Sequence, residues 1–179
     1  MMLETVPPQA VISSDRFDLR PLRKSDKGMI EHYAGDLRVS KFIRGLPHPL
    51  PPGATEALID RSHASDRTED VWAIDGTKAG APEFMGIITL ERMDRGQSEI
   101  GYWVAPPFWN TGIASAAVET LIDANPQQSK TLFAEVFQDN AVSARVLTNC
   151  GFEYLGDAET FSVARNAKVA TWTYSRKLS

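Results

Sequence analysis

Cysteine is nearly absent from this chain, whose 179 residues include only Cys150. A single thiol excludes an intramolecular disulfide and a thiolate metal cluster, and we expect no metal site. Long apolar runs are also missing, because no stretch approaches the ~20 apolar residues that a membrane-spanning helix needs. Residues 1–12 contain Glu4, Pro7 and Pro8 and lack the cationic and apolar regions of a secretory signal. The sequence therefore predicts a soluble, cytoplasmic protein without a membrane partner.

Net positive charge is missing too. The 19 Lys and Arg residues are outnumbered by 23 Asp and Glu residues, which gives a formal net charge of −4. This balance argues against a nucleic-acid partner, because such proteins carry a broad basic surface. Hydrophobic residues make up 42% of the chain, as in an ordinary globular protein, and the length suits one domain. We predict an N-terminal tail over residues 1–13, flexible or lying along a sheet edge, and a single domain over residues 14–179.

Hydrophobic periodicity predicts a strand-rich chain with helices between the strands. The predicted strands are 16–22, 71–74, 84–91, 99–104, 131–137, 152–155, and a hairpin of 161–165 with 169–176. The predicted helices are 25–33 with Ser25 as N-cap, 37–43, 55–65, 112–125 and 140–149. The segment from Gly45 to Gly53 contains four prolines and is a predicted loop. This order of elements favours a mixed α+β sheet over a doubly wound parallel one.

The stretch from Glu99 to Asn125 contains the main candidate site. Ile100, Tyr102 and Val104 alternate with more polar positions, which indicates a strand, and the two prolines that follow end it. From Gly112 the apolar residues take helical spacing, so a helix is predicted to begin there. The segment is therefore a strand, a short turn and a helix that begins in small residues.

A helix that begins in this way has a chemical use. Its first N–H groups are unpaired and its N-terminal end carries partial positive charge, so it can hold a phosphate group. Small residues in the first turn let a ligand approach the backbone closely. Many junctions of this kind bind nothing, and the loop lacks both the Gly-Lys-Ser/Thr ending of a nucleoside-triphosphate loop and the three-glycine dinucleotide motif.

Six residues of this loop resemble a known motif. Trp109 to Ala114 lie on the positions of the Gln/Arg-x-x-Gly-x-Gly/Ala loop, which binds the acyl-CoA pyrophosphate in the GCN5-related N-acetyltransferase (GNAT) superfamily; its RimJ/RimL-like ribosomal-protein branch often has Trp first. Asn110 and Thr111 replace the Gly and the Arg or Lys that are usual in this branch. A second motif, Asn-x-x-Ser-x-x-Val-Leu-x-x-x-Gly-Phe, is matched from Asn140 to Phe152. With both motifs, the chain is identified as a member of this superfamily from about Asp15 to Leu178.

The resemblance implies a single GNAT-type domain, with a mixed, mostly antiparallel sheet of six to seven strands, about four flanking helices and a splayed central strand pair. It implies acetyl-CoA as the acetyl-donating co-substrate. The acceptor would be a primary amine, of a protein N-terminus or a small molecule, that attacks directly in a ternary complex, and the protein would be a monomer or homodimer. The alternative is a CoA-binding sensor or interaction domain with little catalysis. The residues implied to bind the cofactor are Val104, Trp109, Asn110, Thr111, Gly112, Ile113, Ala114 and Asn140.

The same resemblance implies two catalytic residues. Glu99 stands where relatives often keep a glutamate that deprotonates the amine, usually through water, although an exposed strand glutamate would look the same. Many relatives protonate the thiolate with a tyrosine seven residues after the motif asparagine. Leu147 stands there, and Ser143 is the substitute that the branch suggests. Asn140 would contact the cofactor arm, cap its helix, or do both.

Three further residues have competing interpretations. Cys150 could act as a nucleophile, but a buried structural role is the prediction. Arg44 and His48 flank the proline-rich loop, which by resemblance would line the acceptor side. They would either select a carboxylate-bearing acceptor or simply be solvated loop residues.

Overall fold

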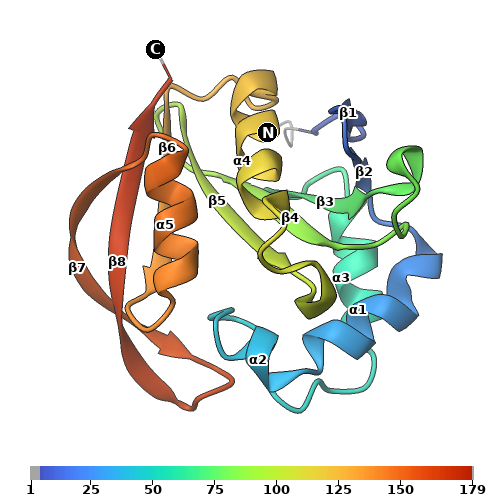
Figure 1. Ribbon diagram of the computed structural model, residues 1–179, viewed down its shortest axis with the longest axis horizontal. Coiled ribbons are helices and arrows are strands. Elements are labelled where there is room, and N and C mark those ends of the chain that lie inside the picture. Colours follow the sequence, from blue (N-terminus) through green and yellow to red (C-terminus); the bar gives the residue numbers. More distant parts are fainter. Residues whose placement is uncertain (1–4, 179) are drawn as a thin grey trace.

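The computed structural model describes residues 5–178, which form one eight-stranded sheet with helices packed on both faces (Figure 1). The strand order is β1-β2-β3-β4-β5-β6-β8-β7, and every neighbouring pair is antiparallel except β5 and β6. The strands are β1 (Ile12–Ser13), β2 (Asp18–Pro21), β3 (Glu69–Asp75), β4 (Gly86–Arg92), β5 (Gln97–Val104), β6 (Thr131–Phe137), β7 (Glu153–Ser162) and β8 (Ala167–Lys177). The helices are α1 (Lys27–Ala34), α2 (Leu37–Ser40), α3 (Ala54–Ser62), α4 (Ile113–Ala124) and α5 (Ala141–Asn149), with short 3₁₀ turns η1 (Lys24–Asp26), η2 (Thr77–Ala79) and η3 (Pro106–Phe108).

The predicted α+β class is confirmed, and the elements differ from the prediction at three places. Ser25 is not an N-cap: η1 precedes α1, Arg23 is its cap residue, and the Arg23 N–H donates to Asp26 Oδ2 at 2.8 Å. The two predicted strands after residue 152 are one ten-residue strand, β7. The structure also has a strand that was not predicted, β1, which lies within the predicted tail.

Residues 5–13 of that predicted tail lie against the sheet, while residues 1–4 fall outside the described part of the chain. Gln9 forms two hydrogen bonds with the backbone of Val71 on β3, at 2.8 and 3.0 Å. The Trp72 indole donates to the Ala10 carbonyl at 3.2 Å. Among residues 5–178, no helix has the length and apolar character to cross a membrane.

The sheet separates two hydrophobic cores, because successive strand residues point to opposite faces. On β4, Ile88 packs in the larger core with Leu121 of α4, whereas Ile87 packs in the smaller core with Ile30 of α1 and Ile59 of α3. Helices α4 and α5 therefore cover one face, and α1 and α3 cover the other. A ligand inserted between two strands of the sheet would therefore be accessible from both faces.

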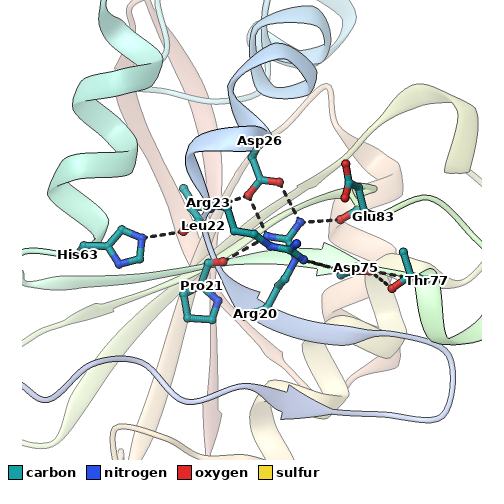
Figure 2. A network of polar contacts seen from close by, with 9 residues as sticks. All are labelled: Arg20, Pro21, Leu22, Arg23, Asp26, His63, Asp75, Thr77 and Glu83. Atoms are coloured by element: carbon teal, nitrogen blue, oxygen red, sulfur yellow. Dashed lines mark hydrogen bonds and ion pairs between the residues drawn. The ribbon is translucent and has the colours of Figure 1, made fainter.

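A buried ion-pair network fixes the start of the domain (Figure 2). The Arg20 guanidinium on β2 contacts both carboxylate oxygens of Asp26 at 2.8 and 2.9 Å and Asp75 Oδ2 at 2.7 Å. It also donates to the Glu83 carbonyl at 2.8 Å. Because each buried charge has partners, these hydrogen bonds and ion pairs offset the desolvation of the charges and tie β2, η1 and the end of β3 together. It anchors the sheet beneath α1, away from the central strands.

The parallel pair β5–β6 is joined over a short length only. Seven residue pairs join β4 to β5 and seven join β6 to β8, whereas only three, ending at Glu99 and Phe133, join β5 to β6. The joined end is held by the Ser98 hydroxyl, which lies 2.6 Å from Gln127 Oε1 and 2.5 Å from the Ser129 hydroxyl. Beyond it the strands separate, which confirms the predicted splayed pair. We call the unpaired stretches, residues 100–104 of β5 and 134–137 of β6, the splay.

Candidate active site

The N-terminal end of α4 presents free backbone donors beside the splay. Gly112 is the cap residue, with a left-handed φ of 78° and no side-chain cap. The first helical hydrogen bond runs from Ala116 N to Gly112 O at 3.0 Å. Within residues 5–178, the N–H groups of Ile113, Ala114 and Ser115 donate to no protein acceptor. Three amides and the partial positive charge of a twelve-residue helix therefore point at one spot.

The loop before α4 is folded back onto the end of β5. The Trp109 indole donates from Nε1 to the carbonyl of the buried Val104 at 2.6 Å, and its side chain remains 42% exposed. Asn110 has a positive φ of 61°, and the Thr111 hydroxyl donates to the Phe108 carbonyl. The residues of this region that the sequence implied for cofactor binding, Val104 and Trp109 to Ala114, thus come together at the open end of the splay.

Arg16 reaches the same loop and was not among the predicted site residues. Its Nη2 donates to the Thr111 carbonyl at 2.9 Å, and its Nη1 would lie 3.5 Å from a Cβ atom placed on Gly112. The guanidinium therefore adds a positive charge beside the α4 end. No sequence signal marks it, because 95 residues separate Arg16 from Thr111.

Helix α5 contributes Asn140 and Ser143. Asn140 caps the helix, since its Oδ1 accepts from Ser143 N at 3.3 Å. The Ser143 hydroxyl donates to the Tyr102 hydroxyl at 2.8 Å, which in turn donates to the Ser143 carbonyl at 3.0 Å. Burial raises the pKa of Tyr102, so its hydroxyl stays protonated. The alternation of residues 100–104 places Tyr102 on a strand face, as the structure has it, but carries no information about this bridge between β5 and α5.

Glu99 lies at the last joined residue pair of β5 and β6, and its side chain is 23% exposed. Its carboxylate contacts Arg44 Nη2 at 2.9 Å, and Arg44 Nη1 lies 3.2 Å from Glu135 on β6. Burial raises the pKa of Glu99, the nearby Glu91 and Glu135 raise it further, and Arg44 opposes them. Glu99 is therefore a partly buried carboxyl that takes up a proton more readily than a solvated glutamate.

Two residues are removed from the chemistry by burial. Cys150 is 3% exposed, and burial raises the pKa of its thiol to about 11. A thiol of that pKa is almost fully protonated at neutral pH and is a weak nucleophile. Leu147, which replaces the tyrosine of many relatives, is fully buried in the core beneath α4 and α5.

Comparisons with known proteins agree with this geometry. Residues 16–153 match the acetyltransferase (GNAT) domain family, and the chain belongs to that family. A GNAT-family acetyltransferase from Bacillus anthracis superposes with a TM-score of 0.79 at 18% identity, over 94% of this chain and 99% of the other. Spermidine N-acetyltransferase from Vibrio cholerae, solved with CoA and spermine, gives 0.77 at 15% identity over 92% and 97%. Ribosomal-protein-S5-alanine acetyltransferase from Vibrio fischeri gives 0.76 at 18% identity over 96% and 98%. At these identities the superpositions establish the shared fold.

Proposed function

We propose that this protein transfers an acetyl group from acetyl-CoA to a primary amine by direct attack. The observation that carries the proposal is the set of three free amides at the start of α4, placed at the mouth of the splay. A diphosphate group fits those amides, and an extended pantetheine arm fits between two strands whose facing edges lack a strand partner. The co-substrate supplies the activated acyl group as a thioester.

The chain offers a cation for the diphosphate even though Thr111 replaces the basic residue that is usual in the branch. Arg16 takes that place from a distant part of the sequence, at the Thr111 carbonyl. A guanidinium beside a helix N-terminus strengthens anion binding, because the positive charge and the free N–H groups act together. We propose Arg16 as a cofactor-binding residue alongside Gly112, Ile113 and Ala114. Trp109 holds the loop in place through Val104, and Asn140 retains a free amide nitrogen for the cofactor arm.

Glu99 and the hydroxyl pair of Tyr102 and Ser143 lie on opposite faces of the sheet, because Glu99 and Tyr102 are three residues apart on one strand. In the proposed reaction the amine is deprotonated on one face, and the thiolate leaves on the other. Glu99 takes one proton from the acceptor ammonium, and the neutral amine forms the new C–N bond as the thioester C–S bond breaks. The proton that the amide nitrogen then loses neutralises the departing thiolate. In the free protein the Ser143 hydroxyl donates its proton to Tyr102; with the co-substrate bound, it turns from Tyr102 and donates a hydrogen bond to that sulfur, while Tyr102 keeps its hydrogen bond to the Ser143 carbonyl.

The identity of the acceptor is a separate question. Structural neighbours include enzymes named for spermidine, for an alanine of ribosomal protein S5 and for the α-nitrogen of ribosomal protein L7/L12. Spermidine and a free protein α-amino group both offer a primary amine. An amine of this general class suits the carboxylates on the acceptor face, Glu99 and Glu135. We therefore propose a cationic primary amine, on a small molecule or at a protein N-terminus.

Two measurements test the proposal. Calorimetry should detect CoA binding to the full chain, and thiol release from acetyl-CoA should be stimulated by at least one amine in a panel of polyamines and N-terminal peptides. Binding without thiol release for any amine would instead favour the CoA-binding sensor, for which the substitutions at Asn110, Thr111 and Leu147 are the supporting observation. Absence of CoA binding would refute both functions.

A further inference from the structure

Arg44 connects the two strands of the splay through its side chain. One guanidinium nitrogen lies 2.9 Å from Glu99 on β5 and another lies 3.2 Å from Glu135 on β6. No strand hydrogen bonds join β5 and β6 at the level of Glu135, where pairing has already ended. A single cation therefore bridges the two strands on the face where the amine acceptor is proposed to enter.

The backbone that carries Arg44 is fixed from outside the sheet. The Arg44 carbonyl accepts from Val163 N at 3.0 Å, and Arg165 donates to the Lys41 carbonyl at 2.9 Å. Arg165 is itself held by Asp139, at 2.6 Å. Figure 1 shows α2 next to the tip of the β7–β8 hairpin that supplies these contacts. The Arg44 side chain, by contrast, is 46% exposed. The backbone around Arg44 is thus held by hydrogen bonds that do not involve its guanidinium, and the half-exposed side chain has room to leave Glu99 and Glu135.

The charges around Glu99 explain why a cation is held there. Glu91 of β4 stands opposite Glu99, and Glu69 of β3 stands opposite Glu91, so three carboxylates form one row across the sheet. Glu135 approaches from β6. Arg44 lowers the pKa of both Glu69 and Glu99, and Arg61 lowers that of Glu69. Arg44 is therefore the guanidinium that acts on both ends of the row. If Arg44 left, the group would lack one further positive charge, which an ammonium ion can supply with donors of the same kind.

We propose that Arg44 is a displaceable latch on the acceptor site, and that the incoming amine binds as an ammonium ion in its place on Glu99 and Glu135. This positioning role rests on the proposed acetyl transfer. While Arg44 is in contact, it favours the ionised form of Glu99. The ammonium that replaces Arg44 opposes proton uptake in the same way until it gives one proton to Glu99. Burial and the carboxylates of Glu91 and Glu135 then hold that proton on Glu99, beside the neutral amine.

The latch also defines the chemical class of the acceptor. The sequence left open whether Arg44 selects a carboxylate-bearing acceptor or is solvated, and its contacts support neither interpretation, because two glutamates occupy the guanidinium. Those glutamates would repel a carboxylate next to the reacting nitrogen. We expect polyamines and peptide N-termini to be accepted and free α-amino acids to be rejected.

The test compares Arg44→Met with Arg23→Met as a matched control. Arg23 is 49% exposed and pairs with Asp75 on β3, so its removal deletes a similar guanidinium away from the splay. In Arg44→Met, carbon-detected NMR of the full chain without acceptor should give a higher Glu99 pKa than in wild type, because the cation that opposes the effect of burial is gone. The Kd and KM for spermidine and for an alanine-initiated peptide should fall about two- to fivefold, because no internal cation competes. Arg23→Met should change none of these values.

Two results would overturn the latch: an unchanged Glu99 pKa in Arg44→Met, or weaker binding of both amines. The second would mean that Arg44 builds the site instead of occupying it. Amine binding is followed by NMR and needs no turnover. If wild type binds the amines but releases no thiol from acetyl-CoA, the proposed function fails while the binding comparison still decides for or against the latch.

Discussion

Replacing Gly112 with aspartate and, in parallel, with asparagine isolates the charge at the start of α4. Gly112 has a φ of 78°, a left-handed conformation that asparagine and aspartate tolerate better than other residues with side chains. A Cβ atom there would meet Arg16 Nη1 at 3.5 Å, an ordinary contact. Both variants therefore fit equally well and differ in one negative charge. Gly80, with the same φ of 78° and open space around it, gives a positional control as Gly80→Asp.

The expected effect on CoA affinity follows from electrostatics. Two unit charges about 5 Å apart interact by about 0.8 kcal/mol in water and by about 3 kcal/mol at an effective dielectric constant of 20. The start of α4 is partly open to solvent, so a value of about 1–2 kcal/mol is appropriate. Gly112→Asp should therefore bind CoA roughly 5- to 30-fold more weakly than Gly112→Asn. Gly80→Asp should bind like wild type.

Stability should change in the opposite direction. Each substitution costs about 1 kcal/mol of folding free energy through the left-handed backbone, but a carboxylate at a helix N-terminus recovers about 0.3–1 kcal/mol through the helix dipole. In thermal unfolding without ligand, Gly112→Asp should be the more stable of the pair, although it is the weaker binder in calorimetry. Equal CoA affinity for the two variants would refute the placement of the diphosphate at this helix.

Three other predictions concern single residues. Arg16→Met should weaken CoA binding about three- to tenfold at low salt and less at high salt, because a screened charge contact is lost; calorimetry at two ionic strengths measures this, and a loss that ignores salt would contradict it. Glu99→Gln should lower kcat/KM most at pH values above the Glu99 pKa and below the amine pKa, where the base is ionised and the amine is still protonated; identical pH–rate profiles exclude the role. Cys150→Ala should keep its activity and lose about 1 kcal/mol of stability to a small cavity, and a folded but inactive variant would restore the covalent route.

The proposed catalytic arrangement depends on how the central strands end their pairing. Ser98 holds the closed end of β5 and β6 together with Gln127 and Ser129. At the open end, the Tyr102–Ser143 hydrogen bonds bridge β5 to α5 on one face, and Arg44 bridges β5 to β6 on the other. The thioester and the amine can therefore be approached from separate layers, which suits a direct transfer in a ternary complex.

The sequence by itself determined the local elements around the site. Alternation along β5, the two prolines after it and the small residues that follow placed the strand, the turn and the start of α4 at Gly112. The cap at Asn140 could also be read directly, because capping involves neighbours within one turn. The prediction that Ser25 caps this helix was wrong, because Ser25 lies inside η1 and the neighbouring Asp26 carboxylate accepts the hydrogen bond from the N–H of Arg23. Residue preferences do not decide which of two adjacent polar residues makes such a bond.

Only the tertiary structure decided which distant side chains complete the site. Arg16 meets Thr111 across 95 residues, Arg44 meets Glu99 across 55, and Tyr102 meets Ser143 across 41. Each meeting depends on strand order and register, which set where side chains from different elements converge. Periodicity reports the face on which a residue lies but carries no information about its partner on another strand or loop. For that reason the sequence could not predict that Arg16 contacts the loop before α4 or that Arg44 contacts Glu99 and Glu135.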